Sequence, residues 1–275
     1  MAKHAKTLRI IAEARAVLAA HSPMTLRQVF YQLVSRQVIE NSEGRYKALS
    51  KALVQARRDG TIPWEWIEDR QRQPRRVSMW RGLADFAEMA KRAYRRNVWE
   101  SQPAYVECWL EKDALSGIFE DILHRYGVTL CVGRGFDGWD SIHNAAVRYG
   151  GGQGVTVLYF GDFDPSGEDM VRSLRERLES FDCKPEIVKC ALTREDIARY
   201  NLPPNPTKLT DTRRPAFVAK HGDMAVELDA LPLEVLQERI RHELEARLDM
   251  EALRAVRATE REERDRLEEL LTDAA

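Results

Sequence analysis

The chain has 275 residues, of which 44% are hydrophobic and 32% charged, with a net charge of -1, so it is long enough to bury a substantial core. No apolar run approaches the length that crosses a bilayer, and the N-terminus lacks a signal-peptide pattern, so we expect a cytoplasmic protein with no membrane partner. No CxxC pair is present, which favours buried thiols over disulfides or zinc ligands for the four cysteines, Cys108, Cys131, Cys183 and Cys190.

The small net charge hides a strong asymmetry along the chain. Residues 1–97 carry 20 Lys/Arg against 9 Asp/Glu, a balance of +11. Residues 98–205 carry 11 against 18, a balance of -7, and the remainder carries 12 against 17, a balance of -5. A basic first third before an acidic middle predicts a polyanion partner and a cation site on separate parts of the protein.

The first third has the pattern of three helices followed by an extended segment. Apolar residues at helical spacing predict helices within 6–21, 22–39 and 44–60, with Thr25 as the N-cap of the second. The third helix is expected to turn Tyr46, Leu49, Leu53 and Val54 inward. Residues 61–80 are basic, aromatic and interrupted by two prolines, which predicts an extended wing. This order is typical of a winged helix, a helix-turn-helix variant that binds DNA.

Basic side chains of this region are the candidate contacts to double-stranded DNA. They are Lys47, Lys51, Arg57 and Arg58 on the third helix, and Arg72, Arg75 and Arg76 in the wing. A charge run of this kind is usually a solvated face, but the regional excess favours nucleic acid, because phosphate contacts supply most of such binding. For the neighbouring Trp64 and Trp66, core packing is favoured over base stacking.

After a predicted linking helix over 85–99, the sequence pattern changes to that of alternating strands and helices. The predicted strands are 104–110, 128–135, 154–162 and 185–192, with helices between them. Near-continuous apolar strands separated by helices predict an α/β fold with a parallel sheet covered on both faces. Residues 224–231 have the pattern of a further strand. Two helices close the chain, and the last either packs on the sheet or pairs with another copy. We therefore expect domains at 1–97, 98–230 and 231–275.

Three acidic residues follow two of the predicted strands. Glu111 comes after the strand 104–110, and Asp162 and Asp164 end the strand 154–162. Ligands of open parallel sheets bind outside the carboxyl ends of the strands, and alternate residues of an extended segment share a face. Carboxylates with no nearby His or Cys suit Mg²⁺, for which Mn²⁺ would substitute. An aspartate that caps a helix would explain the Asp pair alone, but the matching glutamate favours a metal site.

These acids belong to three blocks that resemble a known family. The blocks are Glu111-Lys112-Asp113-Ala114, Gly133-Arg134-Gly135-Phe136 and the segment 162–167, which reads DFDPSG. In order and separation they resemble the Toprim domain, the metal-binding α/β module of topoisomerases, primases and some nucleases. The likeness is to the A subunit of topoisomerase VI and the related meiotic double-strand-break protein, in a compact version. It implies a Rossmann-like sheet that binds Mg²⁺ through Glu111, Asp162 and Asp164.

The resemblance extends upstream to residues 25–31, which read TLRQVFY. They are similar to the tyrosine motif of that family, with Arg27 and Tyr31 matched and Phe30 in place of a first tyrosine. The match implies that Tyr31 attacks the DNA phosphodiester and forms a 5'-phosphotyrosyl link, while Arg27 offsets the developing charge. It also implies a homodimer in which the tyrosine of one subunit faces the metal of the other. The alternative is that Tyr31 is a core side chain.

Our leading hypothesis is a nucleoid-associated, type IIB topoisomerase-like enzyme that cleaves DNA and would reseal the break. No ATP-binding motif is visible, so strand passage driven by ATP would need a separate ATPase subunit. One alternative is a hydrolytic Toprim nuclease of phage or plasmid defence, in which Tyr31 is structural. The other is a non-catalytic DNA-binding subunit.

Overall fold

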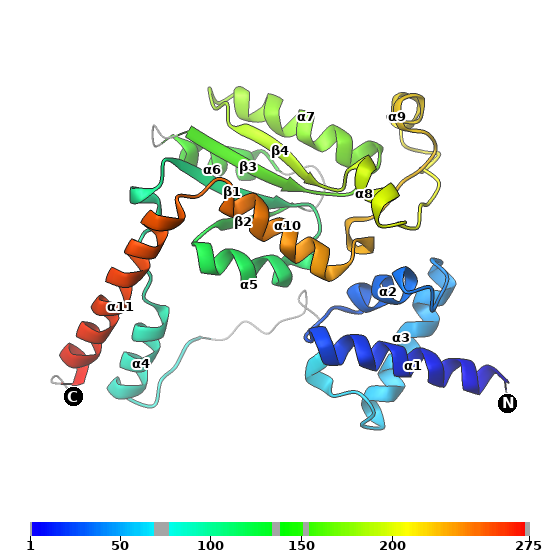
Figure 1. Cartoon of the computed structure of the whole chain (residues 1–275), viewed down its shortest axis with the longest axis horizontal. Coiled ribbons are helices and arrows are strands. Elements are labelled where there is room, and N and C mark those ends of the chain that lie inside the picture. Colours follow the sequence, from blue (N-terminus) through cyan, green and yellow to red (C-terminus); the bar gives the residue numbers. More distant parts are fainter. Residues whose placement is uncertain (1, 69–76, 134–137, 151–153, 273–275) are drawn as a thin grey trace.

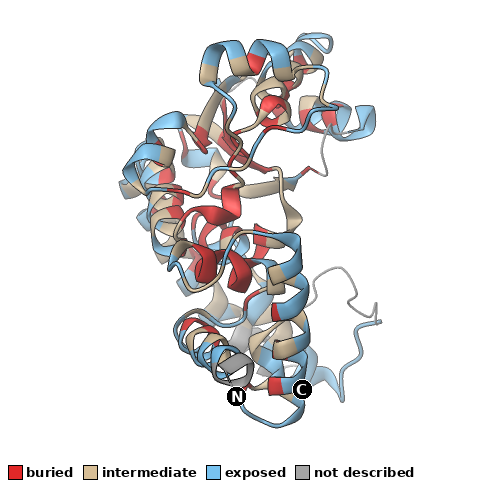
Figure 2. Ribbon diagram, turned by 90° about the vertical axis from the view of Figure 1, so that its right-hand side faces the viewer, coloured by how far each residue is buried: buried red, intermediate tan, exposed pale blue. Residues whose placement is uncertain are grey.

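The computed structural model describes residues 2–68, 77–133, 138–150 and 154–272. Three helices form one end of the molecule, a parallel sheet with helices on both faces forms the middle, and a pair of helices forms the other end (Figure 1). Buried residues lie in the sheet, on the helix faces that contact it, and on the inner sides of the three N-terminal helices (Figure 2). Within these residues, no helix combines the length and the apolar character that crossing a membrane requires.

The three N-terminal helices are present as predicted. They are α1 (Ala2–His21), α2 (Leu26–Ser35) and α3 (Glu43–Arg58), and they pack against one another. Thr25 caps α2 in a capping box, because its hydroxyl accepts a hydrogen bond from Gln28 N while its own N–H donates to Gln28 Oε1 at 2.6 Å. Val54 was wrongly expected to point inward, since it is 41% exposed on α3.

The wing of the predicted winged helix is not seen among the described residues. After α3, residues up to 68 form the short helix η1 (Trp64–Trp66) and one isolated parallel bridge between Met24 and Ile67. Arg57 holds this segment against α3, because its Nη2 donates to the carbonyl oxygens of Trp64 at 2.7 Å and Ile67 at 3.1 Å. The guanidinium also stacks on Trp64, 4.2 Å from the ring centroid.

The α/β prediction for the middle of the chain is confirmed by a four-stranded parallel sheet. The strands are β1 (Ala104–Leu110), β2 (Thr129–Val132), β3 (Gly154–Phe160) and β4 (Glu186–Ala191), in the spatial order β2-β1-β3-β4. This order is compatible with a Rossmann-like fold. All four strands are parallel, and β2 lies on one side of β1 while β3 and β4 lie on the other, so the order of the strands reverses between β1 and β3. That reversal creates the crevice in which open α/β sheets bind ligands.

Helices cover both faces of the sheet. On one face lie α5 (Ser116–Tyr126), which follows the short helix η4 (Asp113–Leu115), and α10 (Leu233–Glu245). On the other lie α6 (Trp139–Tyr149) and α7 (Pro165–Glu179) (Figure 1). Two apolar clusters follow from this arrangement: Val106, Phe119 and Leu158 belong to the first, and Trp109, Ile142 and Leu174 belong to the second.

Glu107, in the middle of β1, is a fully buried charge of the second face. Arg148 of α6 donates to both of its carboxylate oxygens, at 2.9 and 2.8 Å, and the Tyr149 hydroxyl donates at 2.7 Å. Burial alone would raise the pKa of Glu107. The hydrogen bonds together have the larger effect, so the pKa of Glu107 is lowered. Glu107 therefore anchors α6 to the sheet and lies away from the strand ends.

The predicted strand at 224–231 is wrong. This segment contains isolated bridges, one between Phe163 and Val226 and one between Asn205 and Ala225, followed by the short helix η5 (Leu228–Ala230). Backbone pairing is limited to these bridges, and beyond them Leu228 N donates to a side chain, Asp162 Oδ1, at 2.8 Å. Helices α8 (Arg194–Arg199) and α9 (Arg214–His221) lie between β4 and this segment.

The C-terminal helix pairs with a helix from the first third of the chain. α11 (Met250–Thr272) packs against α4 (Leu83–Ala93) and the short helix η3 (Trp99–Ser101), at the end of the molecule opposite α1–α3 (Figure 1). The two alternatives from the sequence were packing on the sheet and pairing with another copy, and neither describes this contact. α4 therefore lies with α11, although the predicted boundary at residue 97 assigned it to the N-terminal domain.

Candidate active site

The acids predicted from the sequence meet at the crevice between β1 and β3. Glu111 follows β1, and Asp162 follows β3, its neighbour in the sheet. The two are joined directly, since Asp162 N donates a hydrogen bond to Glu111 Oε2 at 2.9 Å. Glu111 N in turn donates to Phe160 O at 2.9 Å, which continues the strand pairing to the acidic residue. The sheet therefore fixes Glu111 against the aspartate loop, as predicted.

Asp164 has the role of helix cap that the sequence left open. Its Oδ1 accepts a hydrogen bond from Gly167 N at 2.7 Å, and Pro165 occupies the first position of α7. Gly167 is needed for a close approach, because a Cβ there would lie 2.2 Å from the carbonyl oxygen of Asp162. Burial raises the pKa of Glu111, and the charge of Asp164 raises it further. Asp164 thus caps α7 and acts electrostatically on Glu111.

Asp162 is the most enclosed of the three acids, with 8% of its surface exposed. Its Oδ1 accepts the hydrogen bond from Leu228 N and lies 3.3 Å from Lys112 Nζ. Burial raises the pKa of Asp162 to about 7, against the opposing effect of Lys112 and with a further increase from Glu111. Asp162 is therefore protonated more easily than an exposed aspartate.

Lys112 connects the acidic site to a second pair of acids. Its Nζ lies 2.6 Å from Glu227 Oε2 and 2.7 Å from Asp229 Oδ1, in addition to its contact with Asp162. Burial acts to lower the pKa of Lys112, but the three carboxylates raise it above its ordinary value. Glu227 and Asp229 belong to the segment 224–231, for which the sequence predicts a strand, and Lys112 belongs to the first of the three motif blocks.

Asp229 is an unusual member of this cluster. Its side chain is fully buried, and among the described residues its Oδ2 has no hydrogen-bond partner. A buried, incompletely paired carboxylate costs free energy, so the single bond to Lys112 is important for tolerating it.

Tyr31 and Arg27 of α2 reach the same cluster. The Tyr31 side chain is 6% exposed, and its hydroxyl is hydrogen-bonded to Glu227. Burial and this bond raise the pKa of Tyr31 far above its ordinary value. Arg27 Nη1 lies 3.7 Å from Glu227 Oε2. Tyr31, Glu227, Lys112 and Asp162 thus form one network within a single chain, whereas the resemblance implied a tyrosine that faces the partner's site.

The chemistry of the three acids fits a hard divalent cation. Glu111, Asp162 and Asp164 offer only carboxylate oxygens, and burial, with a further contribution from the neighbouring carboxylates, raises the pKa of Glu111 and of Asp162. In the part of the chain that the structure describes, however, no three His, Cys, Asp or Glu side chains are arranged to hold a metal ion. The reason is that Asp162 faces Leu228 N and Lys112, and Asp164 faces Gly167 N.

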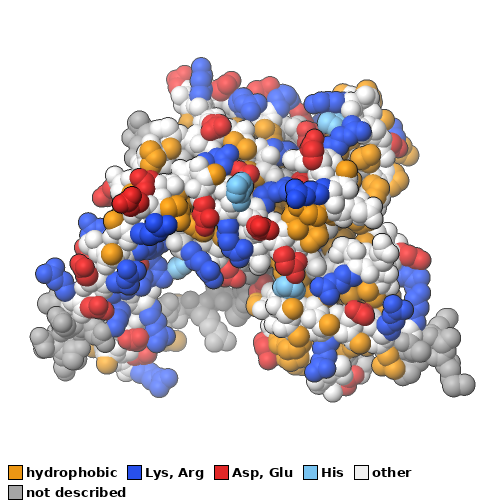
Figure 3. Space-filling model, in the orientation of Figure 1, with side chains coloured by type: hydrophobic (Ala, Val, Ile, Leu, Met, Phe, Trp, Pro, Cys, Tyr) orange, Lys and Arg blue, Asp and Glu red, His pale blue; other side chains and the backbone are white. Residues whose placement is uncertain are grey.

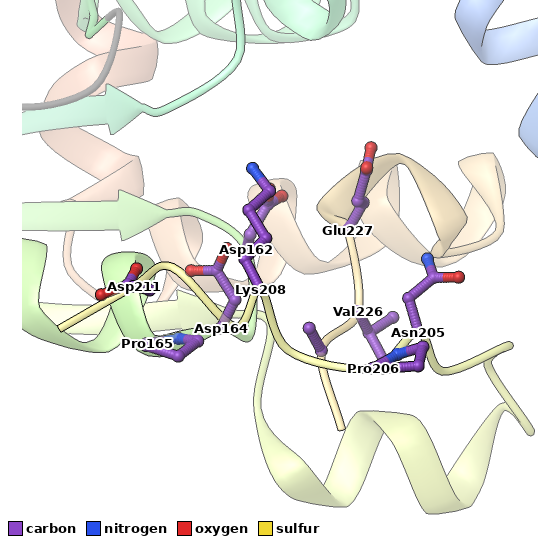
Figure 4. A pocket seen from close by; sticks show the side chains of 10 residues that line it. Asp162, Asp164, Pro165, Asn205, Pro206, Lys208, Asp211, Val226 and Glu227 are labelled. Carbon is purple, nitrogen blue, oxygen red and sulfur yellow. The ribbon is translucent and has the colours of Figure 1, made fainter. Parts of the chain in front are cut away.

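A pocket of about 110 Å³ opens beside these acids (Figure 4). Asp162, Asp164 and Glu227 line it together with Lys208 and Asp211 from the segment before α9. The pocket therefore connects the acidic site with Glu227. Lys208 is part of its lining and supplies a positive charge for contact with an anionic substrate.

The predicted DNA contacts on α3 differ in their availability. Lys51 and Arg58 are exposed, and Lys47 is exposed but paired with Glu43 at 2.6 Å. Arg57 is committed to the backbone of the η1 segment. The wing residues Arg72, Arg75 and Arg76 lie outside the described residues, as do residues 134–136 of the glycine-containing block.

Comparison with protein-family models gives no match for this chain, and comparison with curated proteins gives none either. The functional conclusion therefore depends on the geometry and on the resemblance of the motifs.

Gly161 offers a direct test of the position of Glu111. A Cβ at residue 161 would lie 2.5 Å from Glu111 Oε2 and 2.8 Å from the Tyr159 hydroxyl, so Gly161→Ala must displace the carboxylate. We expect any metal-dependent activity of the site to fall at least about 10-fold, with the fold retained. Gly154→Ala, at the start of β3, is the matched control, because its Cβ would lie 4.0 Å from Ala104 Cβ. Equal activity of the two variants, measured as an initial rate, would contradict this role for Glu111.

Proposed function

We propose that this protein cleaves DNA strands in a Mg²⁺-dependent reaction in which Tyr31 is the covalent nucleophile, as in the A subunit of topoisomerase VI. The observation that carries the proposal is the network that joins Tyr31 of α2 to Asp162 at the end of β3 through Glu227 and Lys112. A tyrosine near an acidic strand-end crevice is the combination that phosphotyrosyl chemistry needs.

The residues of the network have distinct roles in this proposal. Glu227 accepts the proton of the Tyr31 hydroxyl as its oxygen attacks phosphorus, which is necessary because the raised pKa keeps the phenol protonated at neutral pH. Arg27 would offset the negative charge that develops on the phosphate, and Lys112, 2.6 Å from Glu227, keeps that residue in its carboxylate form before the proton arrives. Glu111, Asp162 and Asp164 are the residues that would hold Mg²⁺. When bound, the ion would supply positive charge to a phosphate oxygen and to the leaving 3'-oxygen.

The same proposal includes the partners expected from the sequence. Double-stranded DNA would contact the exposed basic side chains of α3, Lys51 and Arg58, and the N-terminal helices would act as a winged helix. Homodimer formation, a separate ATPase subunit and nucleoid association are further parts of it. Resealing of the break would make the enzyme a topoisomerase.

Hydrolytic cleavage is the second candidate function, and one observation favours it. Tyr31 is 6% exposed and its ring packs edge-on against Phe30, with ring centroids 5.2 Å apart. A tyrosine that stays in this position would be structural, and water would then be the nucleophile.

Incubation of the purified protein with supercoiled plasmid and Mg²⁺ tests the proposal. We expect nicked or linear DNA that carries protein after denaturation and loses it after protease treatment. Glu111→Gln should reduce the rate at least about 100-fold, while Glu179→Gln, an exposed glutamate at the far end of α7, should not. Free DNA ends without adduct would support hydrolysis. Intact plasmid with both Mg²⁺ and Mn²⁺ would refute both candidates and leave a non-catalytic DNA-binding subunit.

A further inference from the structure

A group of arginines lines a pocket at the end of the molecule opposite α1–α3. The pocket has a volume of about 380 Å³ and lies where α11, the end of α5 and the chain after α4 meet. Its charged lining residues are Arg95, Arg125, Arg257, Arg261, Arg264 and Glu260. Lys and Arg side chains are numerous over this part of the surface (Figure 3). Five guanidinium groups against one carboxylate leave a strong local excess of positive charge.

The single acid of the pocket does not neutralise the excess. Glu260 is 3% exposed and is already shared by Arg257 at 2.6 Å, Arg264 at 2.7 Å and the backbone N–H of Arg96 at 2.9 Å. Arg125 and Arg261 are exposed, and within the described residues neither has an acidic partner. Glu260 therefore holds two arginines in place and acts on Arg95, but among the described residues it is no partner of Arg125 or Arg261.

Crowding of like charge is visible in the contacts of Arg95. Its guanidinium donates to the carbonyl oxygens of Arg92 at 2.8 Å and Tyr94 at 2.7 Å, and lies 3.4 Å from His124 Nε2. Burial lowers the pKa of Arg95, and the nearby Arg264 and Arg257 lower it further against the opposing effect of Glu260. A cluster of cations that repel one another costs stability, which an anionic ligand would recover.

The arrangement suits an extended polyanion better than a single small anion. Arg257, Arg261 and Arg264 follow one another along one side of α11, over about 10 Å at 1.5 Å per residue. Duplex DNA carries one negative charge per about 1.7 Å of its axis, so such a row faces several phosphates. We propose that this pocket, the α11 arginine pocket, is a second binding site for the phosphate backbone of duplex DNA, remote from the acidic crevice.

Binding without any divalent metal tests this site apart from cleavage. A labelled duplex of about 40 base pairs is titrated with the full chain in EDTA by fluorescence anisotropy, at several salt concentrations. Arg125→Gln combined with Arg261→Gln should raise the Kd at least about 10-fold and reduce the slope of log K against log salt by about 2, since each phosphate contact contributes about 0.9. Each single variant should give about half of the change in slope. Neither substitution should lower the melting temperature, because repulsion is relieved.

The control changes the same charge elsewhere. Arg175→Gln on α7 combined with Lys184→Gln in the connection between α7 and β4, both at exposed positions, should leave the slope within about 0.5 of the wild type. An unchanged slope for the Arg125 and Arg261 pair, or the same loss in both pairs, would overturn the site. A loss confined to inorganic phosphate or to phosphatidylserine vesicles, with duplex binding unaffected, would also overturn it. Because no metal is present, none of these results depends on whether the protein cleaves DNA.

Discussion

Tyr31→Phe should abolish the covalent protein–DNA adduct and reduce strand cleavage by more than about 10³-fold, because the attacking oxygen is removed while the acidic crevice stays intact. The substitution leaves Glu227 bonded to Lys112 at 2.6 Å and near Arg27, so that carboxylate remains paired. Denaturing gels of plasmid reactions, run with and without protease, measure adduct and cleavage together.

The stability of the Tyr31→Phe variant distinguishes a catalytic role of the Tyr31 hydroxyl from a role of the side chain in packing. The ring keeps its contact with Phe30, and one hydrogen bond to Glu227 is lost, so the free energy of unfolding should fall by only about 1 kcal/mol. Tyr46→Phe on α3 is the matched control, since Tyr46 also packs edge-on against Phe30, with centroids 5.3 Å apart. Tyr46→Phe should cleave like the wild type. Full cleavage by Tyr31→Phe, with free DNA ends, would identify water as the nucleophile and Tyr31 as structural.

The sheet and its helices were predictable because their signals are local. Apolar strands of four to seven residues alternate with amphipathic helices, and a capping residue such as Thr25 marks a helix start within a few positions. The meeting of Glu111 with Asp162 was also predictable, because parallel strands present their carboxyl ends at one edge.

Contacts between distant segments could not be predicted in this way. The pairing of α4 with α11 joins residues near 90 to residues near 260, and periodicity gives the apolar face of a helix without its partner. The segment 224–231 has a strand-like alternation of acids, yet Leu228 N and the side chains of Glu227 and Asp229 bond to Asp162 and Lys112 instead. Which donor a buried carboxylate faces depends on every group nearby, and sequence spacing does not contain that information.

Lys112→Met should lower the free energy of unfolding by about 4 kcal/mol, the other large effect that the structure predicts. Lys112 is the cation shared by Asp162, Glu227 and Asp229, and its removal leaves buried carboxylates without compensation. Urea denaturation followed by circular dichroism measures the change. Lys184→Met, at an exposed position, is the control and should change the value by less than about 0.5 kcal/mol.

A double-mutant cycle with Asp229→Asn tests whether the loss is electrostatic. Asp229 has a fully buried side chain whose Oδ2 lacks a partner among the described residues, so removing its charge should recover about 1–3 kcal/mol in the Lys112→Met background.

Because Lys112 also lies 3.3 Å from Asp162 Oδ1, it competes with any cation that the three acids hold. Mg²⁺ should therefore raise the free energy of unfolding more in Lys112→Met than in the wild type. Additive losses in the cycle, together with equal responses to Mg²⁺, would show that Lys112 acts through packing and that the two halves of the network are independent.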